Sequence, residues 1–245
     1  MPQLAAKGPV LVHFFDFAQV NSVRTLPYLR EWHRRYRDTG LAVLGVQAPR
    51  FPFGADPEAV RTALERLEVA FPVAIDAERD LWLDYGCEVW PSLFLWGRGG
   101  ALAWYHFGEG EYLATEEAIR EELPDPGGGA PEPMQALRET DAPGARVMPP
   151  SPELFPGGSE QRPWVAGEDG ETLSADYEAG GAYATVEGSG QLGLELDGVA
   201  CRPVAVDGPF LYELASHPGH ESHTLTLRPA GGLRIWSVSF APGVP

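Results

Sequence analysis

Residues 10–29 constrain the fold more than any other part of the chain. They begin with a largely apolar run, Val10–Phe17, whose β-branched and aromatic residues favour a buried strand. A short turn follows, and Asn21 or Ser22 is then suited to cap a helix. Pro27 falls inside that helix, where the missing backbone donor predicts a kink. A strand, a tight turn and a helix in this order predict the start of an α/β sheet.

The rest of the first half alternates between strand and helix patterns. The first helix should end before Gly40, and further helices are predicted at 58–67, 80–85 and 111–123. Strands are predicted at 41–46, 71–76, 92–96 and 101–107. The last two strands are joined by a glycine-rich turn, which indicates a hairpin. Crossover connections followed by a hairpin predict a mixed sheet flanked by helices.

Several separated motifs resemble a known family. Tyr85–Leu95 is similar to the segment that carries the cis-proline of thioredoxins, and this resemblance assigns that role to Pro91. Arg24–Leu29, Trp90-Pro91 and Phe107–Tyr112 resemble more closely the thioredoxin-like domain of DipZ-type proteins, which are relatives of cytochrome c biogenesis and disulfide-relay proteins. The resemblance implies a thioredoxin-like domain over residues 1–123.

The resemblance also implies that the family's chemistry is lost. In active members a cysteine at the helix N-terminus attacks a disulfide as thiolate, and a second cysteine resolves the mixed disulfide. The four corresponding positions here are Gln19, Val20, Asn21 and Ser22. His13 falls where the family has its buried acid, and Phe15 falls where it has a tryptophan. We therefore expect a vestigial, redox-inactive site without catalytic residues or a cofactor.

Two other chemistries stay open. A serine nucleophile would need His13 to point at Ser22, but the apolar strand around His13 favours a packed side chain. A thiol-dependent oxidoreductase or peroxide-related enzyme would have to act through Cys87 or an external thiol. Cys87 and Cys201 fall in different halves, so we expect two isolated, mostly buried thiols. The absence of a CxxC sequence argues against a cysteine zinc site.

The main alternative to a former redox site without function is that this site still binds a peptide in a groove. Asn21, Ser22, Trp90 and Pro91 are its candidate residues, because the cis-proline edge holds extended substrates in active relatives. The same Trp90-Pro91 corner would shape the fold even if nothing bound there. Both explanations stand at this point.

The second half has a different pattern. Residues 124–160 are rich in proline and glycine and are predicted to be a linker, with a short helical piece at Met134–Thr140. From residue 161 to 245 short strands recur between glycine turns, which predicts an antiparallel β-sandwich of the jelly-roll kind. The predicted strands are 173–177, 181–186, 191–196, 202–206, 210–214, 223–227 and 233–240.

Short motifs in this half resemble the β domain that follows the thioredoxin-like domain in DipZ-type proteins and is similar to a carbohydrate-binding module. They are Ser151–Gly157, Leu211–Leu214, Leu225–Leu227 and Ser237–Phe240. Glycan binding needs exposed aromatic rings, although aromatic residues at strand spacing often belong to a core. The candidates by residue type are Trp164, Tyr177, Tyr183, Tyr212 and Trp236.

The segment His217–His223 contains three histidines. A metal site is one explanation. A solvated loop that leads into a strand is the simpler one, so we expect no metal.

The net charge of the chain disfavours some classes of binding partner. The formal net charge is −17 and the calculated pI is about 4.7, so nucleic acid and anionic membrane surfaces are disfavoured. No apolar run approaches the roughly 20 residues of a membrane helix. Residues 1–9 lack the pattern of a secretory signal, which favours the cytoplasm if Met1 is the native start. If a leader was removed, the resemblance implies an extracytoplasmic location. The expected function is non-catalytic recognition of a protein, peptide or glycan.

Overall fold

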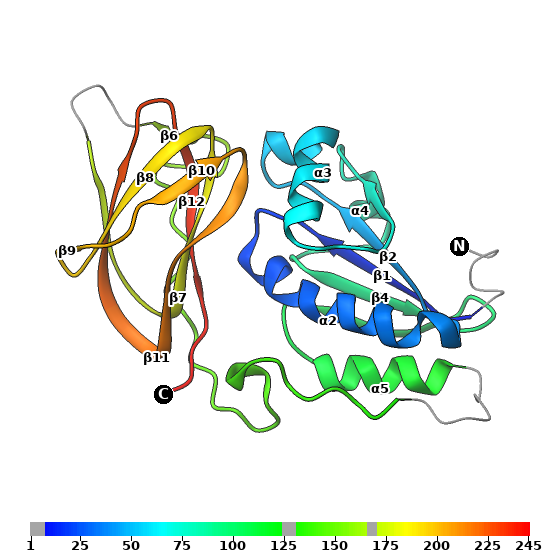
Figure 1. Ribbon diagram of the computed structural model, residues 1–245. Helices are drawn as coiled ribbons and strands as arrows, with labels where there is room; N and C mark the ends of the chain where they lie inside the picture. Colours follow the sequence, from blue (N-terminus) through cyan, green and yellow to red (C-terminus); the bar gives the residue numbers. More distant parts are fainter. Residues whose placement is uncertain (1–7, 124–130, 166–170) are drawn as a thin grey trace. The chain divides into compact units, whose positions relative to one another are not determined.

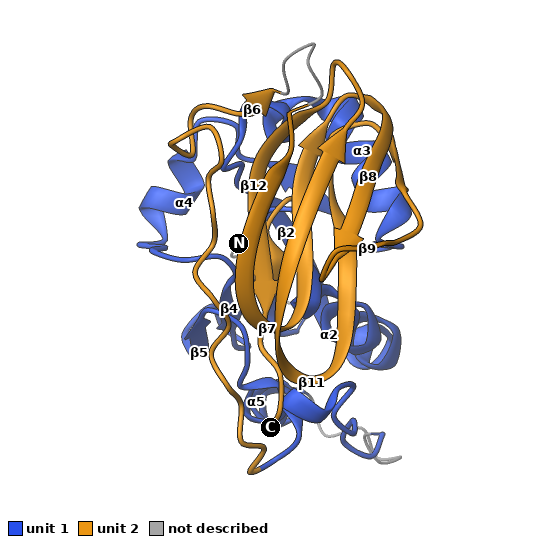
Figure 2. Cartoon of the chain, turned by 90° about the vertical axis from the view of Figure 1, so that its left-hand side faces the viewer, with its two compact units in different colours: residues 1–17, 21–143 blue, residues 18–20, 144–245 orange. Residues whose placement is uncertain are grey.

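The computed structural model describes residues 8–123, 131–165 and 171–245 (Figure 1). The chain divides into two compact units (Figure 2). Unit 1 contains residues 1–17 and 21–143, and unit 2 contains residues 18–20 and 144–245. Each unit has its own sheet and its own buried core.

Unit 1 is built on a five-stranded mixed sheet. Its strands are β1 (Val10–Phe15), β2 (Ala42–Gln47), β3 (Val73–Ile75), β4 (Ser92–Trp96) and β5 (Leu102–Phe107). Their order across the sheet is β3-β2-β1-β4-β5. The pairs β1–β2 and β2–β3 are parallel, whereas β4 runs antiparallel to both β1 and β5. This arrangement confirms the predicted thioredoxin-like fold.

The helices of unit 1 lie close to their predicted positions. They are α2 (Val20–Tyr36), α3 (Pro57–Arg66), α4 (Asp80–Asp84) and α5 (Tyr112–Glu122). Helices α2 and α5 pack together, since the rings of Tyr28 and Tyr112 stack with centroids 3.7 Å apart. One detail was predicted wrongly: α2 begins at Val20, so Asn21 and Ser22 lie in its first turn and not at its cap.

The central strand β1 is buried along its whole length. Because side chains alternate across a strand, Val12 and Phe14 point to one face while His13 and Phe15 point to the other. On the first face Phe14 packs in a core with Trp82 of α4 and with Cys87. Burial on both faces explains why β1 reads as a nearly continuous apolar run.

The expected linker is divided between the two units. Residues 131–143 belong to unit 1, where the backbone amide of Met134 donates to Glu116 Oε2 at 2.8 Å and that of Leu137 donates to Tyr28 Oη at 2.8 Å. Only η3 (Glu139–Asp141) is helical, so the helix predicted at Met134–Thr140 was wrong except at its end. These hydrogen bonds to α2 and α5 supply the partners that a helix would have supplied itself.

Unit 2 is an antiparallel β domain. Its strands are β6 (Trp164–Val165), β7 (Leu173–Glu187), β8 (Ser189–Leu196), β9 (Val199–Ala200), β10 (Val204–Asp207), β11 (Phe210–Pro229) and β12 (Arg234–Ala241). The order is β10-β8-β11-β7-β12-β6, with β9 paired to β8. The predicted class, an α/β domain followed by an antiparallel β domain, is therefore confirmed. The described strands of unit 2 form one hydrogen-bonded sheet, and the jelly-roll form of the predicted sandwich stays a prediction.

Two predicted pairs of short strands are in fact two long strands. Strand β7 continues through Gly180 and Gly181 without a turn. These glycines allow a close approach of chains, because a Cβ atom on Gly180 would lie 2.5 Å from the carbonyl oxygen of Pro242. Glycine in this pattern marked a crowded position in a strand and not a reversal of the chain.

Strand β11 contains a bulge of four residues, 217–220, where the sequence predicted a loop. Its pairing with β7 jumps from Ser216↔Gly181 to Glu221↔Ala179. Before the bulge the side chains of Tyr212 and Leu214 enter the core of unit 2. After it, the side chains that enter the same core are those of Leu225 and Leu227.

Candidate functional site

The turn of the former redox site is built around Ser22. Gln19 immediately precedes α2, and Ser22 lies in the first turn of that helix, fully buried. The hydroxyl of Ser22 accepts a hydrogen bond from the backbone amide of Asp16 at 3.2 Å. The structure therefore keeps the position of the helix N-terminus that the resemblance implied, and it uses Ser22 to hold the turn.

A buried carboxylate lies beside this turn. Asp16 is fully buried; its Oδ1 accepts from Gln47 Nε2 at 3.0 Å and its Oδ2 from the backbone amide of Arg50 at 2.7 Å. Gln47 in turn accepts from the amide of Phe17 at 3.1 Å. The sequence alone did not predict this network, although Asp16 is the one charged residue in the run Val10–Phe17.

His13 does not form a catalytic pair with Ser22. It is fully buried, and its ring stacks on that of Phe15 with centroids 5.1 Å apart and planes 5° apart. Among the described residues neither ring nitrogen of His13 has a hydrogen-bond partner. Burial lowers the pKa of His13 to about 3, so the ring is neutral at physiological pH. A packed histidine, not a general base, is what the structure shows.

The two cysteines are unpaired, as expected. Cys87 is buried in the core of unit 1, and this burial raises the pKa of its thiol to about 11. Cys201 is exposed, which corrects the expectation that both thiols are mostly buried. The two residues lie in different units.

The corner that carries the cis-proline is present. The Trp90-Pro91 peptide bond is cis, which confirms the role that the resemblance gave to Pro91. The indole of Trp90 stacks on Trp82 with centroids 4.1 Å apart, and its Nε1 donates to the carbonyl oxygen of Ala48 at 2.8 Å. Pro91 is buried together with Ser22, while Trp90 and Asn21 are partly exposed. Trp90 is thus held in place by contacts within unit 1.

The aromatic residues considered for glycan stacking are mostly covered. Tyr177, Tyr212 and Trp236 are buried, while Trp164 and Tyr183 are partly buried. Tyr177 and Tyr212 belong to the core of unit 2. None of these five rings presents a fully open face of the kind that sugar stacking uses.

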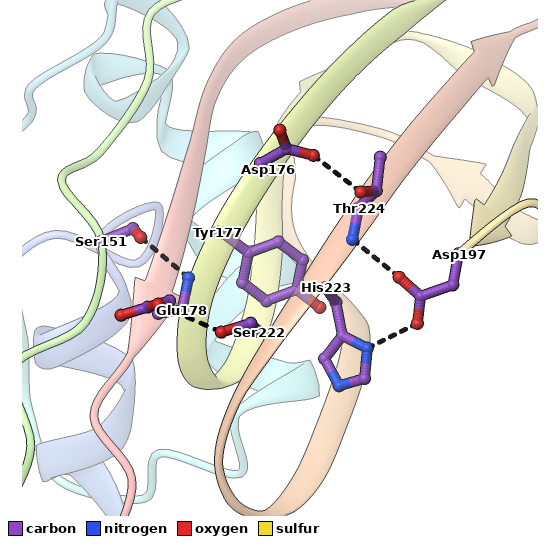
Figure 3. A pocket seen from close by; sticks show the side chains of 8 residues that line it. All are labelled: Ser151, Asp176, Tyr177, Glu178, Asp197, Ser222, His223 and Thr224. Carbon is purple, nitrogen blue, oxygen red and sulfur yellow. Dashed lines mark hydrogen bonds and ion pairs between the residues drawn. The ribbon is translucent and has the colours of Figure 1, made fainter.

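A polar depression of about 320 Å³ opens on unit 2 (Figure 3). We call it the β depression. It is lined by Ser151, Asp176, Tyr177, Glu178, Asp197, Ser222, His223 and Thr224. Thr224 links two of its carboxylates, because its hydroxyl donates to Asp176 at 2.6 Å and its amide to Asp197 at 2.8 Å. The residues from β7 and β11 meet here because those strands pair side by side.

Two histidines stack next to the β depression. The rings of His217 and His223 lie 4.1 Å apart. His223 Nδ1 contacts Asp197 Oδ2 at 2.7 Å and its Nε2 contacts Glu221 Oε2 at 3.2 Å, and the first of these contacts contributes most to raising the pKa of His223. Burial, followed by the nearby charge of His223, lowers the pKa of His217. The three histidines stand out in the sequence, but the bulge that brings two of them together was not predicted.

Comparisons with known proteins find sequences similar to this chain. No family model matches the chain. Protein DipZ of Mycobacterium tuberculosis and that of Mycobacterium bovis are each 26% identical to it over 267 residues, which cover 94% of this chain and 38% of DipZ. NHL repeat-containing protein 2 of Gallus gallus is 29% identical over 175 residues, covering 63% of this chain and 23% of that protein. The chain thus spans less than two-fifths of the length of the DipZ proteins.

The two solved structures named here each match about half of the chain. A thiol-disulfide isomerase from Corynebacterium glutamicum is 21% identical, with a TM-score of 0.46, and covers 50% of this chain and 85% of its own. StoA from Bacillus subtilis is 15% identical, with a TM-score of 0.40, and covers 46% of this chain and 82% of its own. Within residues 8–123, 131–165 and 171–245, no helix is both long and apolar enough to cross a membrane.

The similarity to DipZ covers nearly the whole chain and so includes both units. The strand order of unit 1 and the cis Trp90-Pro91 bond point to the same fold. The chain therefore has a thioredoxin-like fold followed by a β domain and is similar to DipZ proteins, with Gln19 and Ser22 where a CxxC pair would stand.

Proposed function

We propose that this protein is a redox-inactive, non-catalytic recognition protein. The observation that carries the proposal is the state of the former redox turn, where Ser22 is buried and hydrogen-bonded to the amide of Asp16. A serine there cannot form a disulfide, and Gln19 supplies no nucleophile. His13 offers no base because it is packed on Phe15.

The remaining thiol of unit 1 supports the same conclusion. Cys87 has a pKa of about 11, so on the order of one molecule in ten thousand carries the thiolate at pH 7. It belongs to the same buried core as Phe14, Trp82 and Phe94 and is only 7% exposed, which disfavours attack of its sulfur on a protein disulfide. This environment therefore disfavours an oxidoreductase activity that depends on Cys87.

Reduction of insulin by dithiothreitol tests this half of the proposal. The wild-type chain should not accelerate the reaction over dithiothreitol alone. The matched variant Gln19→Cys/Ser22→Cys should accelerate it, because the pair would stand at the start of α2, where the helix amides stabilise a thiolate. Turnover by wild type that disappears in Cys87→Ser would refute the proposal.

For the recognition itself, the β depression offers more polar groups than the cis-proline corner. Asp176, Glu178 and Asp197 are exposed carboxylates whose oxygens can accept hydrogen bonds from sugar hydroxyls. Negative charge at these positions disfavours acidic sugars. At the other corner Ser22 and Pro91 are buried. We therefore place the ligand in unit 2 and propose a neutral glycan.

An array of neutral and acidic oligosaccharides probed with the full chain tests the ligand. Binding should favour neutral glycans and fall at least about tenfold in Asp176→Asn/Glu178→Gln, as expected when hydrogen bonds to charged acceptors are lost. Glu213→Gln is the control, since Glu213 is exposed on β11 outside the depression. A signal unchanged in the double variant, or no signal for any neutral glycan, would contradict this assignment.

A further inference from the structure

The bulge in β11 creates a second site next to the β depression. It removes residues 217–220 from the ladder with β7, so that His217 and His223 stack although six positions separate them. Glu221 resumes the pairing directly after the bulge. One potential ligand atom from each of His217, Glu221 and His223 lies within 4.8 Å of the other two.

From this geometry we infer that His217, Glu221 and His223 bind one divalent transition-metal ion of the zinc type. Two imidazole nitrogens and one carboxylate oxygen form a ligand set that zinc accepts, with a fourth position left for water or a ligand. Ligand atoms about 2.0–2.1 Å from a tetrahedral ion are roughly 3.4 Å apart. His223 Nε2 and Glu221 Oε2 already lie 3.2 Å apart. The side chain of Glu221 is 41% exposed and free to adjust toward His217.

The surrounding residues hold both imidazoles in suitable orientations. Asp197 accepts from His223 Nδ1, at 2.7 Å, which leaves Nε2 as the ligand atom (Figure 3). The Asp197 carboxylate is itself fixed by the backbone amide of Thr224. Tyr177 Oη contacts His217 Nε2 at 2.8 Å and fixes that ring in turn. A contact between a carboxylate and a histidine, such as that of Asp197 with His223, commonly orients the histidine as a metal ligand.

Charge also favours a cation at this position. The eight residues that line the β depression include three carboxylates and neither lysine nor arginine. Glu221 and Asp197 both approach His223. A divalent ion would compensate these negative charges at close range. The inference is independent of the proposed glycan, because the ion needs neither Asp176 nor Glu178.

Titration of the metal-free full chain with Zn²⁺, followed by calorimetry, tests the inference, with Co²⁺ absorption as a second readout. One ion should bind per chain with a Kd in the micromolar range or below. His217→Ala, His223→Ala and Glu221→Gln should each weaken binding by about tenfold or more, and Asp197→Asn should weaken it by a similar factor through loss of orientation. Tetrahedral Co²⁺ should give an intense visible band in wild type that the His223→Ala variant lacks.

Two controls keep the test decisive. His33→Gln removes a histidine of α2 in unit 1 and should leave both the stoichiometry and the Kd unchanged. Circular dichroism in the presence of a chelator should show that each variant is folded. Absence of binding below millimolar Zn²⁺, or equal binding by wild type and a His217→Ala/His223→Ala double variant, would overturn the assignment. The Asp176→Asn/Glu178→Gln variant should still bind Zn²⁺. Loss of glycan binding in that variant can therefore be distinguished from loss of the metal site.

Discussion

Removal of the imidazole of His13 should flatten the dependence of stability on pH. In the folded state this buried ring has a pKa of about 3, while in the unfolded chain its ordinary value is 6.5. Above pH 6.5 the ring is neutral in both states and contributes no pH dependence. As the pH falls from 6.5 toward 3, His13 is protonated in the unfolded chain but stays neutral in the folded one, so the folded state loses stability.

The size of the effect follows from the two pKa values. Between pH 8 and pH 5 the free energy of unfolding should fall by about 2 kcal/mol from His13 alone, since each pH unit below 6.5 costs about 1.4 kcal/mol while only the unfolded ring is protonated. In His13→Leu this part of the fall should vanish. Any constant cost of the substitution cancels, because only the difference between the two pH values is compared.

Urea denaturation at pH 8, 7, 6 and 5 measures this difference. Tryptophan fluorescence reports mainly on unit 1, which contains Trp32, Trp82, Trp90, Trp96 and Trp104. His106→Leu controls for the removal of an imidazole from the edge strand β5. If His13→Leu folds poorly, His13→Phe provides a second non-ionisable variant. The reasoning would be refuted if the free energy of unfolding changed between pH 8 and pH 5 by the same amount, within about 0.5 kcal/mol, in wild type and variant.

Three further substitutions test the packing of unit 1, each by chemical denaturation. Asp56→Ala should cost about 1 kcal/mol, because Asp56 Oδ2 caps the first turn of α3 at 3.2 Å; an unchanged midpoint would contradict this. Gly45→Ala should cost about 1–3 kcal/mol, since the new Cβ would lie 2.9 Å from Val73 Cγ2. Arg24→Met should cost about 3 kcal/mol by leaving the 12% exposed Glu109 short of a partner, and adding Glu109→Gln should recover part of that loss.

The sequence predicted the fold of unit 1 well because its signals are local. Val10–Phe15 is apolar throughout apart from His13, and a central strand buried on both faces requires this composition. Helix α2 begins directly after the turn at Gln19, within two residues of the predicted cap. The corner at Trp90-Pro91 was identified from a short motif whose meaning does not depend on distant residues.

The former redox turn and the histidine pair of unit 2 were predicted less completely, because their contacts join residues far apart in the sequence. The hydrogen bond between Asp16 and Gln47 joins residues 31 positions apart, and no periodic pattern announces such a pair. Likewise, the stacking of His217 on His223 depends on how β11 pairs with β7. Residue types identified these histidines as candidates, but only the register of the strands decides whether their rings meet.

The bulge in β11 has a consequence for how this chain tolerates insertions and deletions. The core-facing side chains of β11 change from even-numbered, Tyr212 and Leu214, to odd-numbered at an earlier register shift between Glu213 and Ala215. Ala215 before the bulge and Leu225 and Leu227 after it are therefore all odd-numbered residues that pack against the core. The number of residues in 217–220 therefore keeps Leu225 and Leu227 on the same face of the strand as Ala215. Loss of one residue there would turn Leu225 and Leu227 toward solvent. Apart from His217, the proposed metal ligand, the length of this segment should matter more for the fold of unit 2 than the identity of its residues.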